Sequence, residues 1–263
     1  MRAGGSAGNS SLALSGLGVA HQYISTIGKD TNGQWLKSEF ESRYCDWIDV
    51  AIDTTLTVGI VHKGGDRCFF TTPGHLLEAE IDPLLSRIPV ALEHVSIALI
   101  SGQYLMPKLC EKSEILMQTL KSKGWIVAID PGWPPEGWND NATSVMTQWL
   151  QQADIALLNE DEVCGYTKQC LLDSGIEAIR SLMDSQACLV VKMGKQGAKA
   201  LVDHHEYSFP APHVNVIDTV GAGDTFNAAF IAALVAGDGV ESALQNGVRV
   251  AAKVISTYPR RYQ

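Results

Sequence analysis

Apolar runs of strand length alternate with helical patterns along most of the chain. Between the runs, apolar residues recur three and four positions apart over residues 108–121, 142–151 and 172–184, which predicts helices. The runs themselves are nearly continuous in apolar character, as expected of strands buried on both faces of a sheet, and occupy residues 95–100, 125–129, 154–158 and 188–193. This alternation predicts an α/β fold in which helices cover both faces of a mainly parallel sheet.

The pattern of residues 55–72 differs from this alternation and predicts a β-hairpin. Residues 55–62 alternate between apolar and polar positions, residues 63–66 (Lys-Gly-Gly-Asp) supply turn residues, and residues 67–72 form a second strand-like run. Such a hairpin belongs either to the edge of the main sheet or to a small sheet of its own.

The segment Ile217-Asp-Thr-Val-Gly-Ala-Gly-Asp-Thr-Phe-Asn227 places two glycines and a carboxylate at the start of a helix. Apolar residues at helical spacing after Gly221 predict that the helix begins between Ala222 and Asp224. Unpaired N–H groups and the positive end of the helix dipole attract an anion there, and glycine permits its close approach. Asp224 is then either a helix cap or a base that takes a proton from an incoming nucleophile.

Composition narrows the class of protein. The chain has 263 residues and a net charge of −9, with one basic cluster at Arg260-Arg261, which argues against a nucleic-acid partner. No apolar stretch is long enough to span a membrane, and no secretion signal opens the sequence. We therefore expect residues 1–263 to form a single enzyme domain without a membrane partner, located in the cytoplasm.

Several motifs occur in the order found in one family. The string Asp218-Thr-Val-Gly-Ala-Gly-Asp-Thr-Phe226 closely resembles the carboxyl-terminal signature of the ribokinase-like (PfkB) carbohydrate kinases. Matches of lower specificity cover the rest of the chain: Gly4-Gly5-Ser-Ala-Gly-Asn9, Gly28-Lys-Asp30-Thr-Asn-Gly33, Asp130-Pro131, Asn159-Glu-Asp-Glu162 and Val191-Lys-Met-Gly194-Lys-Gln-Gly197. The resemblance implies a ribokinase-like three-layer sandwich whose small β lid is the hairpin near residues 55–72.

The resemblance also implies a reaction, in which ATP phosphorylates a hydroxymethyl group of a sugar or sugar-like substrate. Asp224 matches the family's catalytic base. The backbone N–H groups of Gly221, Ala222 and Gly223 match its anion hole for the transferred phosphoryl group.

Gly4, Gly5 and Asn9 match the family's sugar-binding positions. Asn9 could equally be a helix cap that follows an ordinary turn. These residues would contact hydroxyl groups common to many sugars, so they do not name one substrate.

Four further residues match nucleotide-binding positions of the family. Lys192, Gly194 and Gly197 fall in a turn that the resemblance places beside the nucleotide. Asn246 matches a position near the adenine, and a solvent-facing asparagine is the alternative.

Metal ligands are assigned in the same way. Asn159 and Glu162 match an element that holds Mg²⁺ largely through water, and their alternative is a helix cap with a glutamate in the first turn. Asp218 matches the side-chain ligand of a monovalent cation in potassium-activated members. Residues 255–263 differ from the family's cation loop, so the dependence on K⁺ is left open.

Departures from the family keep other functions open. The family's first strand, which ends in a substrate-binding aspartate, has no counterpart before Gly4, so a truncated and non-catalytic form that binds nucleotide or sugar is one alternative. A nucleoside kinase or a kinase of a vitamin-like alcohol is another. The apolar positions of the hairpin would suit contact with a second copy, which makes a homodimer a candidate assembly.

Overall fold

Six strands form the central sheet of the computed structural model. The structure describes residues 2–61 and 67–260. The predicted turn at residues 63–66 and Arg261 of the basic cluster lie outside these ranges. The strand order in the central sheet is β10–β9–β8–β7–β6–β5. Strands β5 to β8 are parallel, and β9 is antiparallel to both of its neighbours. The bounds are Ile97–Ser101 (β5), Ile126–Asp130 (β6), Ile155–Asn159 (β7), Cys188–Lys192 (β8), Ala198–Val202 (β9) and His205–Phe209 (β10). The four predicted core strands, now β5 to β8, are confirmed.

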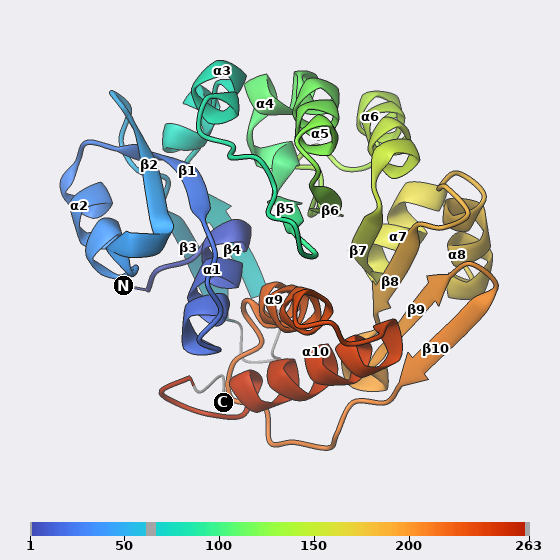
Figure 1. The fold of residues 1–263 in the computed structure, drawn as a ribbon. Coiled ribbons are helices and arrows are strands. Elements are labelled where there is room, and N and C mark those ends of the chain that lie inside the picture. Colours follow the sequence, from blue (N-terminus) through green and yellow to red (C-terminus); the bar gives the residue numbers. More distant parts are fainter. Residues whose placement is uncertain (1, 62–66, 261–263) are drawn as a thin grey trace.

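Helices cover both faces of this sheet (Figure 1). Along β7, Ala156 and Leu158 belong to one apolar cluster and Ile155 and Leu157 to another, because successive side chains of a strand point to opposite faces. The first cluster contains residues of α3 (Ile81–Leu85), α4 (Pro107–Glu111), α5 (Ser113–Ser122), α6 (Asp140–Gln152), α7 (Glu160–Thr167) and α8 (Leu172–Arg180), and the second contains residues of α9 (Ala222–Val235) and α10 (Val240–Ile255). The predicted three-layer α/β sandwich is confirmed.

The amino-terminal part of the chain adds a second, smaller sheet. Strands β1 (Tyr23–Gly28) and β2 (Cys45–Val50) pair in parallel, apart from the six-stranded sheet. Helix α1 (Ser6–Gly16) packs against α9, and α2 (Thr31–Ser38) follows β1. Short 3₁₀ helices lie at Ser42–Tyr44 (η1), Gly74–Glu78 (η2), Gln103–Leu105 (η3) and Gly194–Gln196 (η4). The single-domain organisation and the lack of a further amino-terminal strand stay predictions.

The hairpin near residues 55–72 forms a sheet of its own. Strands β3 (Thr57–Val61) and β4 (Arg67–Thr71) pair antiparallel, with Val58 opposite Phe70, and neither belongs to the six-stranded sheet. The edge-strand alternative is therefore wrong. Within the described residues, no helix has both the length and the apolar character needed to cross a membrane.

Candidate active site

Helix α9 begins directly after Gly221, inside the predicted window. Gly221 is the N-cap residue and has a φ of 77°, a left-handed conformation that favours glycine. Asp224 therefore lies in the first turn and is not the cap. The Ala222 N–H donates to the carbonyl of Thr219 (3.1 Å), so this member of the predicted anion hole already has a partner. For the Gly223 N–H, no backbone acceptor is found in residues 2–61 and 67–260.

The Asp224 carboxylate faces helix α1. Asn9 Nδ2 donates to Asp224 Oδ2 (2.8 Å). Since Asn9 is the fourth residue of α1 and Gly5 is the N-cap, the interpretation of Asn9 as a helix cap is wrong. Burial raises the pKa of Asp224 to about 7, the carboxylate of Asp130 acts in the same direction, and the hydrogen bond from Asn9 opposes both. Such a carboxyl group exchanges protons close to neutral pH.

A second polar cluster lies next to Asp224, where β6 and β8 end. Lys192 Nζ donates to Asp130 Oδ2 (3.2 Å) and to Asn227 Oδ1 (3.1 Å), and the Asn227 amide donates to the Asp130 carboxylate. A Cβ placed on Gly223 would lie 3.5 Å from Lys192 Nζ, so the ammonium group lies beside the start of α9. Lys192 therefore lies beside the anion-binding turn at Gly223, as well as next to the turn between β8 and β9.

The sequence motifs assigned no role to Asp130 or Asn227, and only the importance of Asp130 could have been inferred from the sequence. Asp130 ends a buried parallel strand, and such ends are where ligands bind in α/β sheets. Its exposed fraction is 6%, so a partner was required. That this partner includes Asn227, 97 positions away, depends on how α9 packs on the sheet.

A cavity of about 440 Å³ opens in front of Asp224. The predicted base and the predicted sugar-binding residues line it together, and Thr57 and Gly59 of strand β3 close another side. The full lining is Arg2, Ala3, Gly4, Gly5, Ser6, Asn9, Thr57, Gly59, Val220, Gly221 and Asp224. The hairpin therefore covers the space next to the predicted base, as a lid would.

One family of known proteins matches nearly the whole chain. The model of the pfkB family of carbohydrate kinases matches residues 1–260. The chain belongs to this family. A relative from Halopiger xanaduensis, an ATP-dependent ribose-1-phosphate kinase, is 28% identical over 92% of this chain and 76% of its own. A fructokinase from Rhizobium leguminosarum bv. trifolii is 25% identical over 88% and 71%.

The fold of the kinase is shared with solved structures. The ribokinase of Arabidopsis thaliana, complexed with ribose and ATP, superposes with a TM-score of 0.80 at 20% identity and covers 97% of this chain and 82% of its own. At this identity the likeness concerns the fold, and the ribokinase-like architecture is confirmed. The enzyme class follows from the family match, which is to carbohydrate kinases.

The predicted magnesium element is also a helix cap in this kinase. Asn159 Oδ1 accepts from the Glu162 N–H (2.8 Å), and Glu162 Oε2 accepts from the Asn159 N–H (2.9 Å), which is a complete capping box. Burial, followed by the nearby Asp130 carboxylate, raises the pKa of Glu162 above its usual range. The cap and a role near a cation are therefore compatible, because the capping bond uses one of the two oxygens of Glu162.

The remaining nucleotide assignments fall outside the cavity. Asn246 Nδ2 donates to the carbonyl of Ala229 (3.0 Å) and so joins α10 to α9. A Cβ on Gly197 would lie 2.0 Å from the carbonyl of Phe209, whereas a Cβ on Gly194 would meet only Glu160 Oε1 at 3.8 Å. Both glycines have positive φ, as the turn after β8 requires. Packing thus accounts for the glycine at position 197 and the asparagine at position 246, whereas the space next to Gly194 is open.

Asp218 has partners other than a metal ion. Arg2 Nη1 lies 2.7 Å and Arg260 Nη2 3.2 Å from Asp218 Oδ2, and the Val220 N–H donates to Asp218 Oδ1. A K⁺ ion at this carboxylate would be repelled by two guanidinium groups. The residues therefore do not fit the predicted monovalent-cation site.

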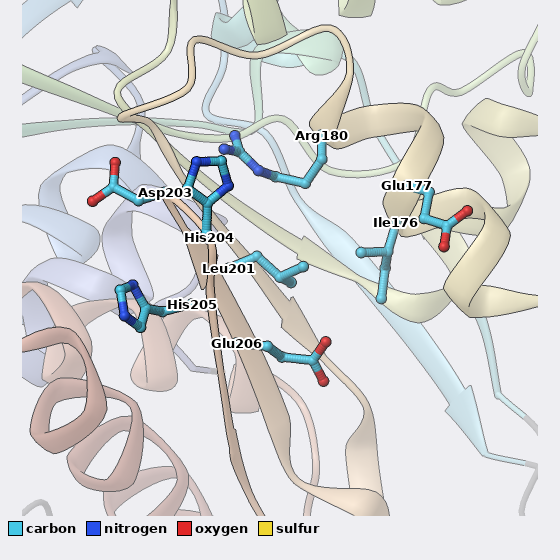
Figure 2. Close-up of a pocket in the computed structure, with 8 residues that line it drawn as sticks. All are labelled: Ile176, Glu177, Arg180, Leu201, Asp203, His204, His205 and Glu206. Carbon is cyan, nitrogen blue, oxygen red and sulfur yellow. The ribbon is translucent and has the colours of Figure 1, made fainter.

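A second cavity, of about 370 Å³, lies between α8 and the β9–β10 turn (Figure 2). None of the predicted site residues lines it. The Arg180 guanidinium at this cavity donates to the carbonyls of Asp184 and Ser185, and Glu206 pairs with Lys199. Because these two charged groups already have partners in the fold and no predicted site residue lines the cavity, we place the chemistry at the Asp224 cavity.

Proposed function

We propose that the kinase transfers the γ-phosphoryl group of ATP to a hydroxymethyl group of a sugar or sugar-like substrate bound in the 440 Å³ cavity. The observation that supports this most strongly is the placement of Asp224, which lines the cavity at the start of α9 and has a pKa raised to about 7. An ionised Asp224 accepts the proton of the attacking hydroxyl group as its oxygen approaches the phosphorus.

The anion hole follows from the same helix start. The N–H groups at Gly221 and Gly223 and the positive end of the α9 dipole stabilise the charge on the transferred phosphoryl oxygens. The ammonium group of Lys192, beside Gly223, adds a positive charge at this point. Because Ala222 donates to Thr219, we assign it a supporting role in the turn.

Mg²⁺ fits the carboxylates of Asp130 and Glu162, which both lie near Lys192. Asp130 and Glu162 are 6% and 4% exposed, and the Asp130 carboxylate disfavours the ionised form of Glu162. Residues Asp130, Glu162 and Asn159 would hold Mg²⁺, mostly through water, and the ion would supply charge neutralisation for the phosphates of ATP.

The cavity favours a sugar over a nucleoside. Among the side chains that the structure describes, the cavity lining includes no aromatic ring, whereas a nucleobase is typically held by stacking on one. Gly4 and Gly5 expose backbone groups, and Asn9, Ser6 and Thr57 offer hydrogen-bonding side chains, which suit hydroxyl groups.

A substrate panel tests this function. Magnesium-dependent release of ADP from ATP is measured with pentoses, hexoses, sugar acids, nucleosides and vitamin-like alcohols. Release with a sugar or sugar acid supports the proposal. Release confined to nucleosides or vitamin-like alcohols would replace the substrate class, and ATP binding without release on the whole panel would indicate a non-catalytic form.

We also propose a homodimer formed through the hairpin. Val58, Ile60 and Phe70 are 52%, 45% and 62% exposed and share one face of the β3–β4 pair, whereas Thr57 and Gly59 on the opposite face line the cavity. An apolar sheet face of this kind is typical of a contact surface. Sedimentation equilibrium at micromolar concentration should show a dimer that Phe70→Ser dissociates, and a monomeric parent protein would contradict this assembly.

A further inference from the structure

Two arginines from opposite ends of the described chain meet at the loop before the anion hole. Arg2 donates to Asp218 Oδ2 (2.7 Å) and to the carbonyl of Val220 (3.1 Å). Arg260 donates to the same two groups. Both guanidinium groups therefore bridge the carboxylate of Asp218 and the carbonyl of Val220, two positions apart in the loop.

A carboxylate and a backbone carbonyl that face one positive centre form the kind of oxygen site that hard cations occupy. Here the positive charge comes from side chains. A guanidinium group is always charged and presents several N–H donors in a fixed plane, so it holds two oxygen atoms in a defined geometry. An inorganic cation at the same point would face two positive charges and would be repelled by both.

Arg260 lies next to the anion hole at Gly221. A Cβ on Gly221 would lie 3.1 Å from Asn9 Nδ2 and 3.3 Å from Arg260 Nη1, so Arg260 and the sugar-binding side of the cavity enclose this residue. The side chain of Arg260 is only 15% exposed, and its charge also opposes the rise in the pKa of Asp224. Arg2 is 42% exposed, and exposed ion pairs contribute little to stability. Arg260 is thus the stronger of the two contacts.

We propose that Arg2 and Arg260 take the place of a monovalent cation in this kinase and position the loop from Asp218 to Gly221, so that the anion hole is formed before ATP binds. Both are positioning residues, because they act through the loop. The inference rests on the proposed phosphoryl transfer at Asp224, and it predicts a kinase that needs no K⁺.

The first test compares salts. Turnover is measured at constant ionic strength in KCl, NaCl, CsCl and tetramethylammonium chloride, for the parent protein and for Arg260→Ala, Arg260→Lys and Arg2→Ala. Arg249→Ala, which removes an exposed arginine from α10, is the matched control. We expect parent and control to vary by less than about twofold among the salts. A parent protein activated several-fold by K⁺ would overturn the inference.

For Arg260→Ala we expect kcat to fall by about tenfold or more, since losing a well-placed anion-hole donor costs 10²–10³. KM for the acceptor should change less than kcat. Millimolar guanidinium or K⁺ should restore part of the rate in this variant only. Arg260→Lys keeps the charge without the planar fork and should lie between the parent and Arg260→Ala, and Arg2→Ala should have the smaller effect. A parental kcat in Arg260→Ala would contradict the positioning role.

A second readout is independent of turnover. Amide hydrogen exchange of residues 218–223 is compared in the parent protein, Arg260→Ala, Arg260→Lys and Arg249→Ala without ligands. Faster exchange in Arg260→Ala, with the control unchanged, supports the inference. Unchanged exchange overturns it even when the protein is an active kinase, and a parent protein that releases no ADP refutes the proposed function separately. Should Arg260→Ala not fold, the salt series of the parent and the exchange in Arg260→Lys decide the question.

Discussion

The acceptor side and the nucleotide side of the site differ in how clearly the structure shows their chemistry. On the acceptor side, Asn9, Thr57 and Asp224 come from α1, β3 and α9 and converge on one cavity. On the nucleotide side, Gly197 is required by the close approach of Phe209, and Asn246 bonds to Ala229. Functional side chains can be recognised by their contacts and their shifted pKa values. Backbone groups that bind a nucleotide have the same geometry as those of an ordinary turn. The evidence for the acceptor side is therefore stronger.

Gly223 is the position at which we expect a substitution to lower activity most. Gly223→Val should lower kcat by about 10³-fold or more, because the side chain blocks the approach of the phosphoryl group to the helix start. The fold should tolerate it, since the nearest atom to a Cβ there is Lys192 Nζ at 3.5 Å. Gly239→Val, where a Cβ would meet nothing within 4 Å, is the control. An unaffected rate would show that the phosphate binds elsewhere.

The next effect is on the pH dependence of kcat/KM, which reports the base of the free enzyme. Since the pKa of Asp224 is raised to about 7, kcat/KM should be level above pH 7 and fall about tenfold for each pH unit below it. A profile that stays level down to pH 5 would mean either an unperturbed carboxyl group or another base.

The smallest expected effect tests the nucleotide side. Asn246→Ala removes the hydrogen bond to the Ala229 carbonyl and should cost about 1 kcal/mol of unfolding free energy, while KM for ATP stays within about twofold. Thermal unfolding and ATP titration of the same preparation separate the two outcomes. A large rise in KM for ATP at unchanged stability would restore Asn246 to the adenine site and weaken the contrast between the two sides.

Local patterns predicted the parts of the fold that depend on local physics. The α9 start was predictable because the glycines and the apolar spacing lie within a dozen residues. The core strands were predictable because β5 to β8 are apolar on both faces. The hairpin followed from its alternation, but its separation from the main sheet depends on packing that no local pattern encodes.

The contacts between distant residues could not be predicted. Asp130 meets Asn227, and Arg260 meets Asp218, only because helices and sheet pack in one arrangement. The sequence motif at Asp218 favoured a metal ligand, yet the two arginines that exclude a cation lie 216 and 42 positions away from it. A motif thus specifies which chemistry a segment can perform, and the fold decides which partner it meets.

The central claim, that Asp224 is the base, is tested most directly by Asp224→Asn, with Asp238→Asn at an exposed position as control. The asparagine can still accept the hydrogen bond from Asn9, so we expect substrate binding to persist and kcat to fall by about 10² or more. The folded-state pKa of Asp224, about 7, lies above its unfolded value of 3.8, so the cost of ionising this carboxyl group in the fold grows between these two pH values and is complete above about pH 7. Asp224→Asn should therefore be more stable than the parent at pH 8, by on the order of 4 kcal/mol, and this gain should shrink as the pH falls below 7 and vanish only near pH 3. A variant that binds both substrates and turns over within about twofold of the parent would contradict the account.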